Sequence, residues 1–214
     1  MLKVYVQQVY HKMSKKTRGE ETRKLIVERA TVLFTKNGYN STSLSDILEV
    51  TGLAKGGFYF HFKSKEELGL ATIDALEDCW TTEILPKMMQ GKDAKEKLHL
   101  MFSAPGDCCS SSGGMRPTIL LLNLATEMIE VNPKFSSALQ RIFTGWLLVL
   151  EAIIEEGKYE HLFRQDADSA AIAAIILSNI MGANLLALLN GNTALYNKQL
   201  SALNDVLFMG IGVA

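Results

Sequence analysis

A pair of glycines in the segment TGLAKGGFYFHF, residues 51–62, is surrounded by side chains that donate hydrogen bonds. The donors are one lysine before the glycines and a tyrosine, a histidine and a second lysine after them: Lys55, Tyr59, His61 and Lys65. Ammonium, phenol and imidazole groups can all donate hydrogen bonds to phosphate oxygens. Gly56 and Gly57 carry no side chain, so their backbone can come close to a polyanion. The alternative is a glycine-rich loop followed by aromatic residues that only pack.

The segments on either side of the glycines have the apolar spacing of helices. A first helix is expected over about 20–36 and a third, short helix over about 54–60. Between them, Ser43 followed three residues later by Asp46 has the form of a capping box, which begins a second helix that Gly52 ends. Two short helices joined by a tight turn form a helix-turn-helix, whose second helix enters the major groove of DNA.

Two hydroxyl side chains directly before the second helix, Thr42 and Ser43, add to the expected phosphate contacts. On the third helix, Phe58 and Phe62 are four residues apart and are expected to face the core, which leaves Tyr59 on the outer side. The sequence therefore predicts one helix face that meets DNA and one that packs inward.

Charge is distributed unevenly along the 214-residue chain. Residues 1–65 contain 12 Lys and Arg against 5 Asp and Glu, a balance of +7, whereas residues 66–214 contain 10 against 18, a balance of −8. A basic front on an acidic body indicates that one end meets a polyanion. Residues 1–19 are expected to form a flexible basic arm, in which Met13 is an alternative start to Met1. A merely solvated tail is the alternative interpretation.

The residue types offer little material for catalysis. Four scattered histidines have no nucleophilic cysteine, metal-ligand spacing or phosphate-binding loop beside them: His11, His61, His99 and His161. We therefore expect no catalytic residue, no metal and no cofactor.

The three cysteines, Cys79, Cys108 and Cys109, favour a reduced, cytoplasmic protein over a disulfide framework. The alternative is that Cys108 and Cys109 form a thiol-based sensor of oxidants or soft metals. A long apolar segment at 170–189 is long enough to cross a membrane, but polar side chains interrupt it and no basic cluster flanks it. We expect a helix buried within one subunit or between two, and no membrane partner.

Residues 20–80 resemble the N-terminal DNA-binding domain of the tetracycline-repressor (TetR) family of bacterial transcription regulators. The resemblance rests on residues held in register along this segment: Thr22-Arg23, Leu33-Phe34, Gly38, Thr42-Ser43, Asp46-Ile47, Tyr59, His61-Phe62 and Lys65. Glu49-Val50-Thr51 departs from the small residues that are frequent there. The resemblance implies an all-α homodimer whose third helices enter successive major grooves of a palindromic operator.

The resemblance also implies how the chain is divided and controlled. Residues 20–80 would bind double-stranded operator DNA, and residues 81–214 would form a larger helical domain that binds a small effector and dimerises through helices near 134–157 and 167–190. Effector binding usually releases DNA in this family. The effector is expected to be mostly apolar, and its candidate contacts, each otherwise an ordinary core residue, are Trp80, Met101, Phe102, Asn123, Glu127 and Trp146.

A ligand-responsive repressor is thus the function that the sequence favours. An enzyme is the first rival class, and the second is a helical adaptor that applies its basic head to an acidic protein or a membrane surface. Salt dependence does not separate the adaptor from a DNA reader, because both contacts are electrostatic. Preference for a palindromic duplex over random duplex separates the two.

Overall fold

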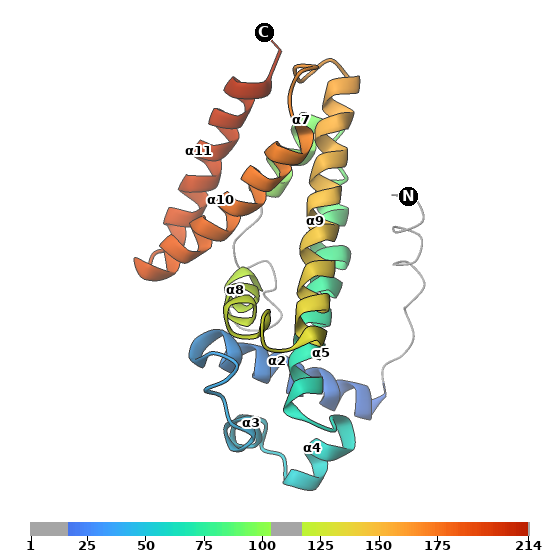
Figure 1. Ribbon diagram of the computed structural model, residues 1–214, viewed down its shortest axis with the longest axis vertical. Coiled ribbons are helices and arrows are strands. Elements are labelled where there is room, and N and C mark those ends of the chain that lie inside the picture. The colour runs from blue at the N-terminus through green and yellow to red at the C-terminus, as the bar shows by residue number, and fades with distance from the viewer. Residues whose placement is uncertain (1–16, 104–116, 214) are drawn as a thin grey trace. The chain divides into compact units, whose positions relative to one another are not determined.

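The described part of the chain, residues 17–103 and 117–213 of the computed structural model, is built from helices. No β-strand occurs within these ranges, where one isolated β-bridge joins Phe163 and Gly212. The predicted all-α fold is confirmed. Figure 1 shows the elements in chain order: α2 (Arg18–Asn37), α3 (Leu44–Thr51), α4 (Lys55–His61), α5 (Lys65–Cys79), the π-helical turn η1 (Trp80–Ile84), α6 (Leu85–Met88), α7 (Ala94–Phe102), α8 (Pro117–Met128), α9 (Pro133–Tyr159), α10 (Ser169–Leu189) and α11 (Thr193–Ile211).

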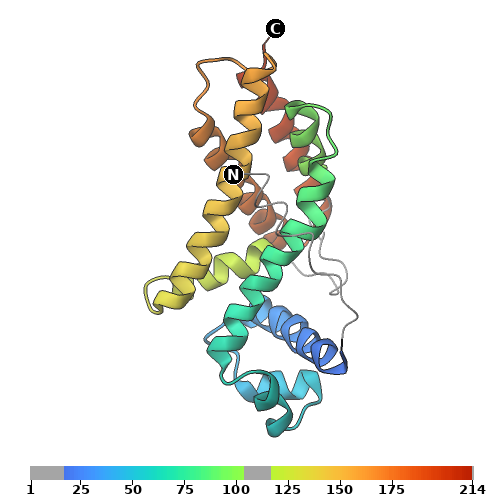
Figure 2. The same ribbon diagram turned by 90° about the vertical axis from the view of Figure 1, so that its right-hand side faces the viewer.

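The described residues divide into two compact units. Unit 1 contains residues 17–79 and 117–140, and unit 2 contains residues 80–103 and 141–213. The sequence suggested a single boundary near residue 80, but α8 and the first turns of α9 belong with the N-terminal helices. The reason is that α8 packs against α2, beside which it lies in both views (Figure 1 and Figure 2). A boundary drawn along the chain cannot show that packing.

Side-chain caps begin the helices around the turn. Ser43 and Asp46 form the predicted capping box at the start of α3. At the start of α5, Ser64 Oγ accepts a hydrogen bond from the Glu67 N–H at 3.1 Å, and the Glu67 carboxylate accepts one from the Lys63 N–H at 2.8 Å. Such caps satisfy N–H groups that have no partner within the helix and contribute about 1 kcal/mol each.

Aromatic rings fill the core of unit 1. Phe34, Phe58 and Phe62 are fully buried. The rings of Phe34, Tyr39 and Phe135 follow one another with centroids 5.1 Å apart at each step. Aromatic pairs at this distance contribute about 0.5–1.5 kcal/mol beyond their burial. The turn between α2 and α3 is therefore held between the end of α2 and the first turn of α9.

In unit 2, α10 packs along α11, and α7 packs against both α11 and α6. Lys97 on α7 is buried, and its ammonium donates to both carboxylate oxygens of Glu156 on α9, at 2.5 and 2.7 Å. A buried cation is tolerated only when it is paired in this way. The ion pair fixes the position of α7 against α9.

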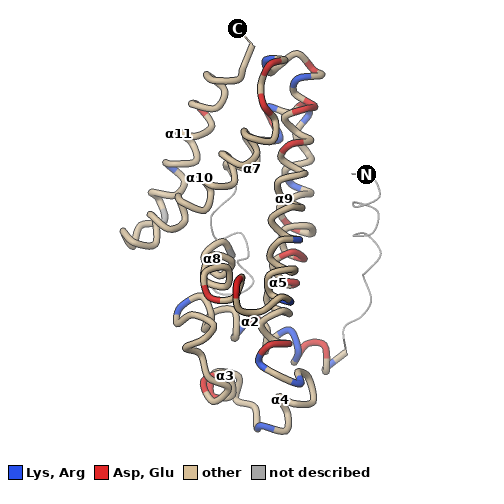
Figure 3. Tube along the Cα trace, in the orientation of Figure 1, with Lys and Arg blue, Asp and Glu red and all other residues tan. Residues whose placement is uncertain are grey.

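Two helices, α9 and α10, are long and apolar enough to cross a membrane by length and composition alone. The core helices of soluble proteins meet the same test, and 39% of the apolar window of each helix is buried inside the protein. α10 contains no charged residue, which Figure 3 shows as an unbroken tan helix. Its exposed apolar side chains form a surface that a partner can cover.

Candidate nucleic-acid interface

The second helix of the helix-turn-helix, α4, is oriented by its neighbours. Gly52 ends α3 in the left-handed conformation, with a φ of 68°, which glycine adopts without strain. Phe58 in the middle of α4 and Phe62 directly after it are both fully buried. Their burial turns the opposite side of α4 outward, as the sequence predicted.

Three of the predicted phosphate donors are accessible to solvent. Lys55 is exposed, Tyr59 is 47% exposed and His61 is partly exposed. Each thus has the accessibility that a contact with a phosphate oxygen requires. Their role in DNA binding stays a prediction.

Phe60 is an exposed residue of α4 that the sequence analysis did not single out. Its side chain is 82% exposed, and its ring stands edge-on to the His61 ring with centroids 5.0 Å apart. Two residues correspond to about 200° of rotation in an α-helix, so Phe60 lies roughly opposite the buried Phe58. That rotation, applied to the sequence, could have identified it.

The space beside the two glycines of α4 is open. Among the residues that the structure describes, a Cβ atom at Gly56 would meet no atom within 4 Å outside the backbone of its own helix, and one at Gly57 would contact only Leu53, at an ordinary 3.6 Å. Alanine would also stabilise the helix by roughly 0.5–1 kcal/mol relative to glycine. The fold therefore gives no reason for glycine at either position, which favours the interpretation that a partner approaches this backbone.

Thr42, which the sequence predicted to contact phosphate, is not exposed in the free protein. Its side chain is fully buried, and its hydroxyl donates a hydrogen bond to the Gly38 carbonyl at 2.7 Å. Threonine often bonds to nearby backbone in this way, and residue spacing does not reveal it. Ser43 is exposed, and its Oγ accepts from the Asp46 N–H at 3.2 Å, which leaves its hydroxyl hydrogen to donate.

Lys65 also faces the protein instead of the solvent. Its ammonium lies 4.3 Å from the centroid of the Tyr39 ring and donates to the Asn40 carbonyl at 3.4 Å. Burial lowers the pKa of Lys65, an effect that the nearby Glu127 and Asp46 carboxylates oppose. The sequence assigned this side chain to phosphate because helical periodicity does not show that an aromatic ring lies under it.

Two expected effector contacts on α8 instead hold the turn between α2 and α3. Glu127 accepts hydrogen bonds from the Tyr39 N–H at 2.9 Å and the Asn40 N–H at 2.6 Å, one on each carboxylate oxygen. Asn123 donates from Nδ2 to the Thr35 carbonyl at 3.0 Å. The sequence did not indicate these roles, because Glu127 and Asn123 each bond to a residue 88 positions away along the chain.

Tyr39 lies at the centre of this contact between α8 and the turn. Burial, together with the carboxylates of Glu66 and Glu127, raises the pKa of Tyr39 to about 12. The phenol is therefore neutral at physiological pH. Glu66 in turn accepts from the Asn132 side chain at 2.8 Å and from the Lys134 ammonium at 2.5 Å, which adds the start of α9 to the same contact.

The other four expected effector contacts, Trp80, Met101, Phe102 and Trp146, are all buried residues of unit 2. Trp80 begins η1, and its ring centroid lies 5.2 Å from that of Trp146. The indole N–H of Trp146 is buried and has no hydrogen-bond partner within the described part of the chain. A buried donor without an acceptor costs about 1–3 kcal/mol. Trp146 is thus the member of this set best suited to a ligand that carries an acceptor.

No group of three or more His, Cys, Asp or Glu side chains that could hold a metal occurs among residues 17–103 and 117–213. Cys108 and Cys109, the expected alternative thiol site, lie outside these ranges, as does most of the expected N-terminal arm. Cys79 is disulfide-bonded, whereas the sequence analysis expected reduced cysteines. Spacing along a chain does not show which cysteines come within bonding distance in the fold.

Two family models match the chain. The model described as bacterial regulatory proteins, tetR family, matches residues 26–72, and the model described as tetracyclin repressor-like, C-terminal domain, matches residues 116–203. The chain is 28% identical over 165 residues to the HTH-type transcriptional regulator TtgR of Pseudomonas putida, a match that covers 74% of this chain and 77% of TtgR. It is 37% identical over 68 residues to the HTH-type transcriptional regulator QacR of Staphylococcus aureus, which covers 32% of this chain and 36% of QacR.

The fold is also that of solved structures. A TetR-family transcriptional regulator from Cytophaga hutchinsonii superposes with a TM-score of 0.77 at 27% identity, covering 94% of this chain and 100% of that one. These matches agree with the helix-turn-helix that α3 and α4 form. The chain belongs to the TetR family of bacterial regulatory proteins, and it is therefore a DNA-binding transcriptional regulator and not an enzyme.

Proposed function

We propose that this regulator is a cytoplasmic repressor that binds a palindromic operator as a homodimer and is released by a small, mostly apolar effector. The observation that carries DNA reading is the outer side of α4, where Lys55, Tyr59 and His61 are accessible beside two glycines with open space around them. Phosphate donors position a protein on the duplex, and a bare helix face can lie close in the major groove. The family description supports the role of repressor.

Selection from a pool of random duplexes tests this proposal. The protein is expected to enrich a palindrome and to bind it roughly a thousandfold or more tightly than scrambled duplex at the same salt concentration. Lys55→Ala and Tyr59→Phe should each weaken that binding. Lys87→Ala, which removes an exposed lysine from unit 2, is the matched control. Equal affinity for palindromic and scrambled DNA, or no effect of either α4 variant, would overturn the proposal.

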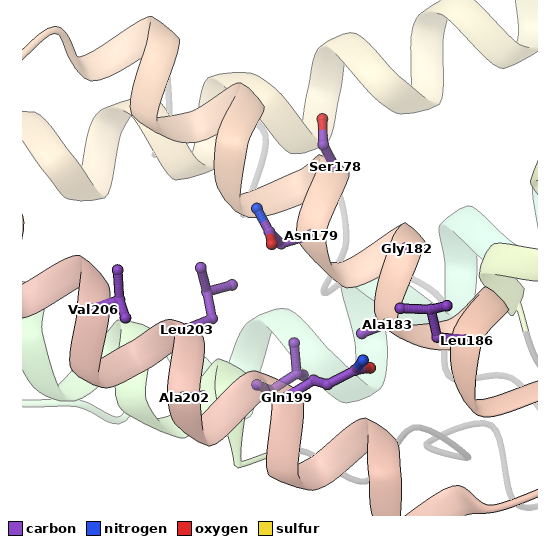
Figure 4. A pocket seen from close by; sticks show the side chains of 10 residues that line it. Ser178, Asn179, Gly182, Ala183, Leu186, Gln199, Ala202, Leu203 and Val206 are labelled. Atoms are coloured by element: carbon purple, nitrogen blue, oxygen red, sulfur yellow. The ribbon is translucent and has the colours of Figure 1, made fainter. Parts of the chain in front are cut away.

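The homodimer surface that we propose consists of α10 and α11. Apolar side chains are exposed on both helices, among them Leu189 on α10, at 73%, and Met209 on α11, at 85%. A groove of about 480 Å³ lies between the helices. Figure 4 shows that residues of both helices line it, including Ser178, Gly182, Leu186, Ala202, Leu203 and Val206. Small residues in this set allow a second pair of helices to approach closely.

This surface replaces α9 by α11, whereas the sequence favoured helices near 134–157 and 167–190. The resemblance implied an interface through 134–157, but the apolar stripe of α9 is buried within the chain: Phe135, Leu139, Ile142, Trp146, Val149, Leu150 and Ile153. Periodicity identifies an apolar face but not what covers it.

Two opposite charges on α11 give the dimer proposal a specific test. Lys198 and Asp205 are exposed and lie about two turns apart with the exposed Ala202 between them. In a contact between identical surfaces, residue i of one copy meets residue j of the other and the reverse. Antiparallel pairing of α11 about Ala202 would bring Lys198 of one copy to Asp205 of the other.

Lys198→Glu is therefore expected to shift dimers toward monomers in sedimentation velocity, and the double variant Lys198→Glu/Asp205→Lys should restore dimers. Lys92→Glu, a charge reversal at an exposed lysine outside this surface, is the control. A Lys198→Glu protein that stays dimeric would contradict pairing through α11.

The Trp80–Trp146 pair is the effector site that we favour, because it combines apolar rings with a buried N–H that lacks an acceptor among residues 17–103 and 117–213. The chain has two tryptophans and both are in this pair, so intrinsic fluorescence reports on it directly. A compound that releases operator DNA should change the tryptophan emission. Trp146→Phe keeps an aromatic ring but removes the donor, and it should weaken that compound about tenfold while operator affinity is unchanged. Release without any change in emission would place the effector elsewhere.

Thiol-based sensing is a second candidate function, favoured by the disulfide at Cys79. It predicts that peroxide changes operator affinity, that dithiothreitol restores it, and that Cys79→Ser abolishes the response. Unchanged operator affinity in peroxide, before and after alkylation with iodoacetamide, would exclude it.

A further inference from the structure

We propose that Phe60 recognises thymine in the operator by packing its ring on the C5-methyl group in the major groove. This inference rests on the proposed function and adds to it the base that α4 selects. Phe60 is 82% exposed in a unit where Phe34, Phe58 and Phe62 are fully buried. A single exposed apolar side chain is common in proteins, but this one lies on the helix that is proposed to read DNA.

Phe60 is uncovered on its face of α4. The helix positions that share a face with it, three and four residues earlier, are occupied by Gly57 and Gly56. Neither has a side chain that could cover the ring, and alanine would fit at both positions within the fold. The two glycines and the exposed ring therefore form one feature, a bare stretch of helix from which a single aromatic group extends.

The direction of the ring is limited by its neighbour. The rings of Phe60 and His61 are perpendicular, with an interplanar angle of 88°. His61 is one of the expected phosphate donors. A contact between His61 and a phosphate would therefore also limit the positions that the Phe60 ring can take against the duplex.

The chemistry of the major groove then selects the base. Thymine presents a methyl group there, whereas none of the other three bases carries a methyl group at its major-groove edge. Phenylalanine has no donor or acceptor, so its favourable contact is with that methyl group. The proposed site is one thymine in each half of the palindrome, at positions related by the two-fold symmetry of the dimer.

The experiment uses the full-length protein and the palindromic duplex that it selects from a random pool. Thymidine is replaced by deoxyuridine at each position in turn, in both half-sites, which removes only the methyl group. At one symmetric pair of positions, affinity should fall about fourfold for each methyl group lost and ~15-fold for both. Phe60→Ala should bind the selected duplex more weakly by a similar factor and should no longer distinguish thymidine from deoxyuridine at those positions.

Val32→Ala, which truncates an exposed apolar residue of α2, is the matched control and should keep the wild-type discrimination. An unchanged midpoint of thermal unfolding for Phe60→Ala verifies that the exposed ring does not support the fold. The inference is overturned, while DNA binding stands, if the wild type ignores deoxyuridine everywhere or if Phe60→Ala retains the discrimination. If Phe60→Ala weakens every duplex equally, the ring packs on the sugar–phosphate backbone and the inference also falls. If no palindrome is selected at all, the proposed function fails first.

Discussion

Two clusters in unit 1 combine glycine with aromatic rings and are used in opposite ways. The inner cluster consists of Gly69, Tyr39 and Phe135, and a Cβ atom on Gly69 would lie 2.6 Å from Phe135 Cζ and 2.7 Å from Tyr39 Cε2. The outer face consists of Gly56, Gly57 and Phe60, where a Cβ atom on Gly56 would meet nothing in the described part of the chain within 4 Å outside its own helix backbone. The chain itself fills the space at the first glycine and leaves it open at the second.

Polar side chains follow the same division. Beside the inner cluster, Glu127 gives both carboxylate oxygens to backbone N–H groups, and the Lys65 ammonium lies over the Tyr39 ring. Beside the outer face, Lys55 and Tyr59 stay exposed. A side chain of the right chemical type is therefore a strong candidate for binding only where the fold does not already use it.

Gly69→Ala should have the largest effect on stability. The added methyl group cannot fit between the two rings, so the aromatic contacts must shift. This shift should lower the free energy of unfolding by about 1–3 kcal/mol. Urea unfolding of the variant should show this loss in the free energy of unfolding. Gly145→Ala is the matched control, because Gly145 is also in a long helix but a Cβ atom there meets nothing within 4 Å. Equal stability of the two variants would mean that the inner cluster is not tightly packed.

Glu127→Gln should have the next largest effect. The amide keeps one acceptor oxygen but loses the charge, so one of the N–H groups of Tyr39 and Asn40 loses its partner, at a cost of about 1–2 kcal/mol. Glu130→Gln, at an exposed glutamate just beyond α8, controls for the change in net charge. If both variants unfold at the same urea concentration as the wild type, the carboxylate does not hold the turn.

The elements could be predicted from the sequence because local rules determine them. The Ser43–Asp46 capping box, the left-handed Gly52 and the inward-facing Phe58 all act within a few residues of one another, and each has a recognisable pattern. The order and arrangement of the helices were expected from the resemblance to the TetR family. The outer set of Lys55, Tyr59 and His61 followed from the same periodicity.

The rest of the site depends on contacts that sequence patterns do not show. Glu127 and Asn123 looked like polar groups in a ligand pocket, but their partners lie in a turn far away along the chain. The donors of Thr42 and Lys65 are already used by a nearby carbonyl and a nearby ring, which the sequence did not show, and their contacts with DNA stay predictions. Phe60 was given no role from the sequence, although its place two residues after the buried Phe58 puts it on the opposite side of the helix.

Gly56→Ala should raise stability but lower operator affinity. Its effect on stability should be smaller than that of Gly69→Ala or Glu127→Gln. The fold has room for the methyl group and the helix gains propensity, so the free energy of unfolding should rise by roughly 0.5–1 kcal/mol. Operator affinity should nevertheless fall, because the methyl group holds α4 away from the groove. Gly145→Ala should show the gain in stability without the loss of affinity. A Gly56→Ala protein that is stabler and binds DNA as well as the wild type would show that the outer face does not approach DNA closely.

Acid should weaken the α3 cap, which gives the smallest of these effects. The pKa of Asp46 lies below its usual value, chiefly because its carboxylate accepts a hydrogen bond from the Ser43 backbone N–H at 2.7 Å. A lowered folded-state pKa means that the stabilisation is complete above the unfolded-state pKa of about 3.9 and is lost as the pH falls through the folded-state value. Between about pH 6 and about pH 3, Asp46→Asn should therefore lose less stability than the wild type. Glu49→Gln, at an exposed carboxylate of the same helix, should follow the wild type, and parallel curves for Asp46→Asn and wild type would show that the cap does not depend on the charge of Asp46.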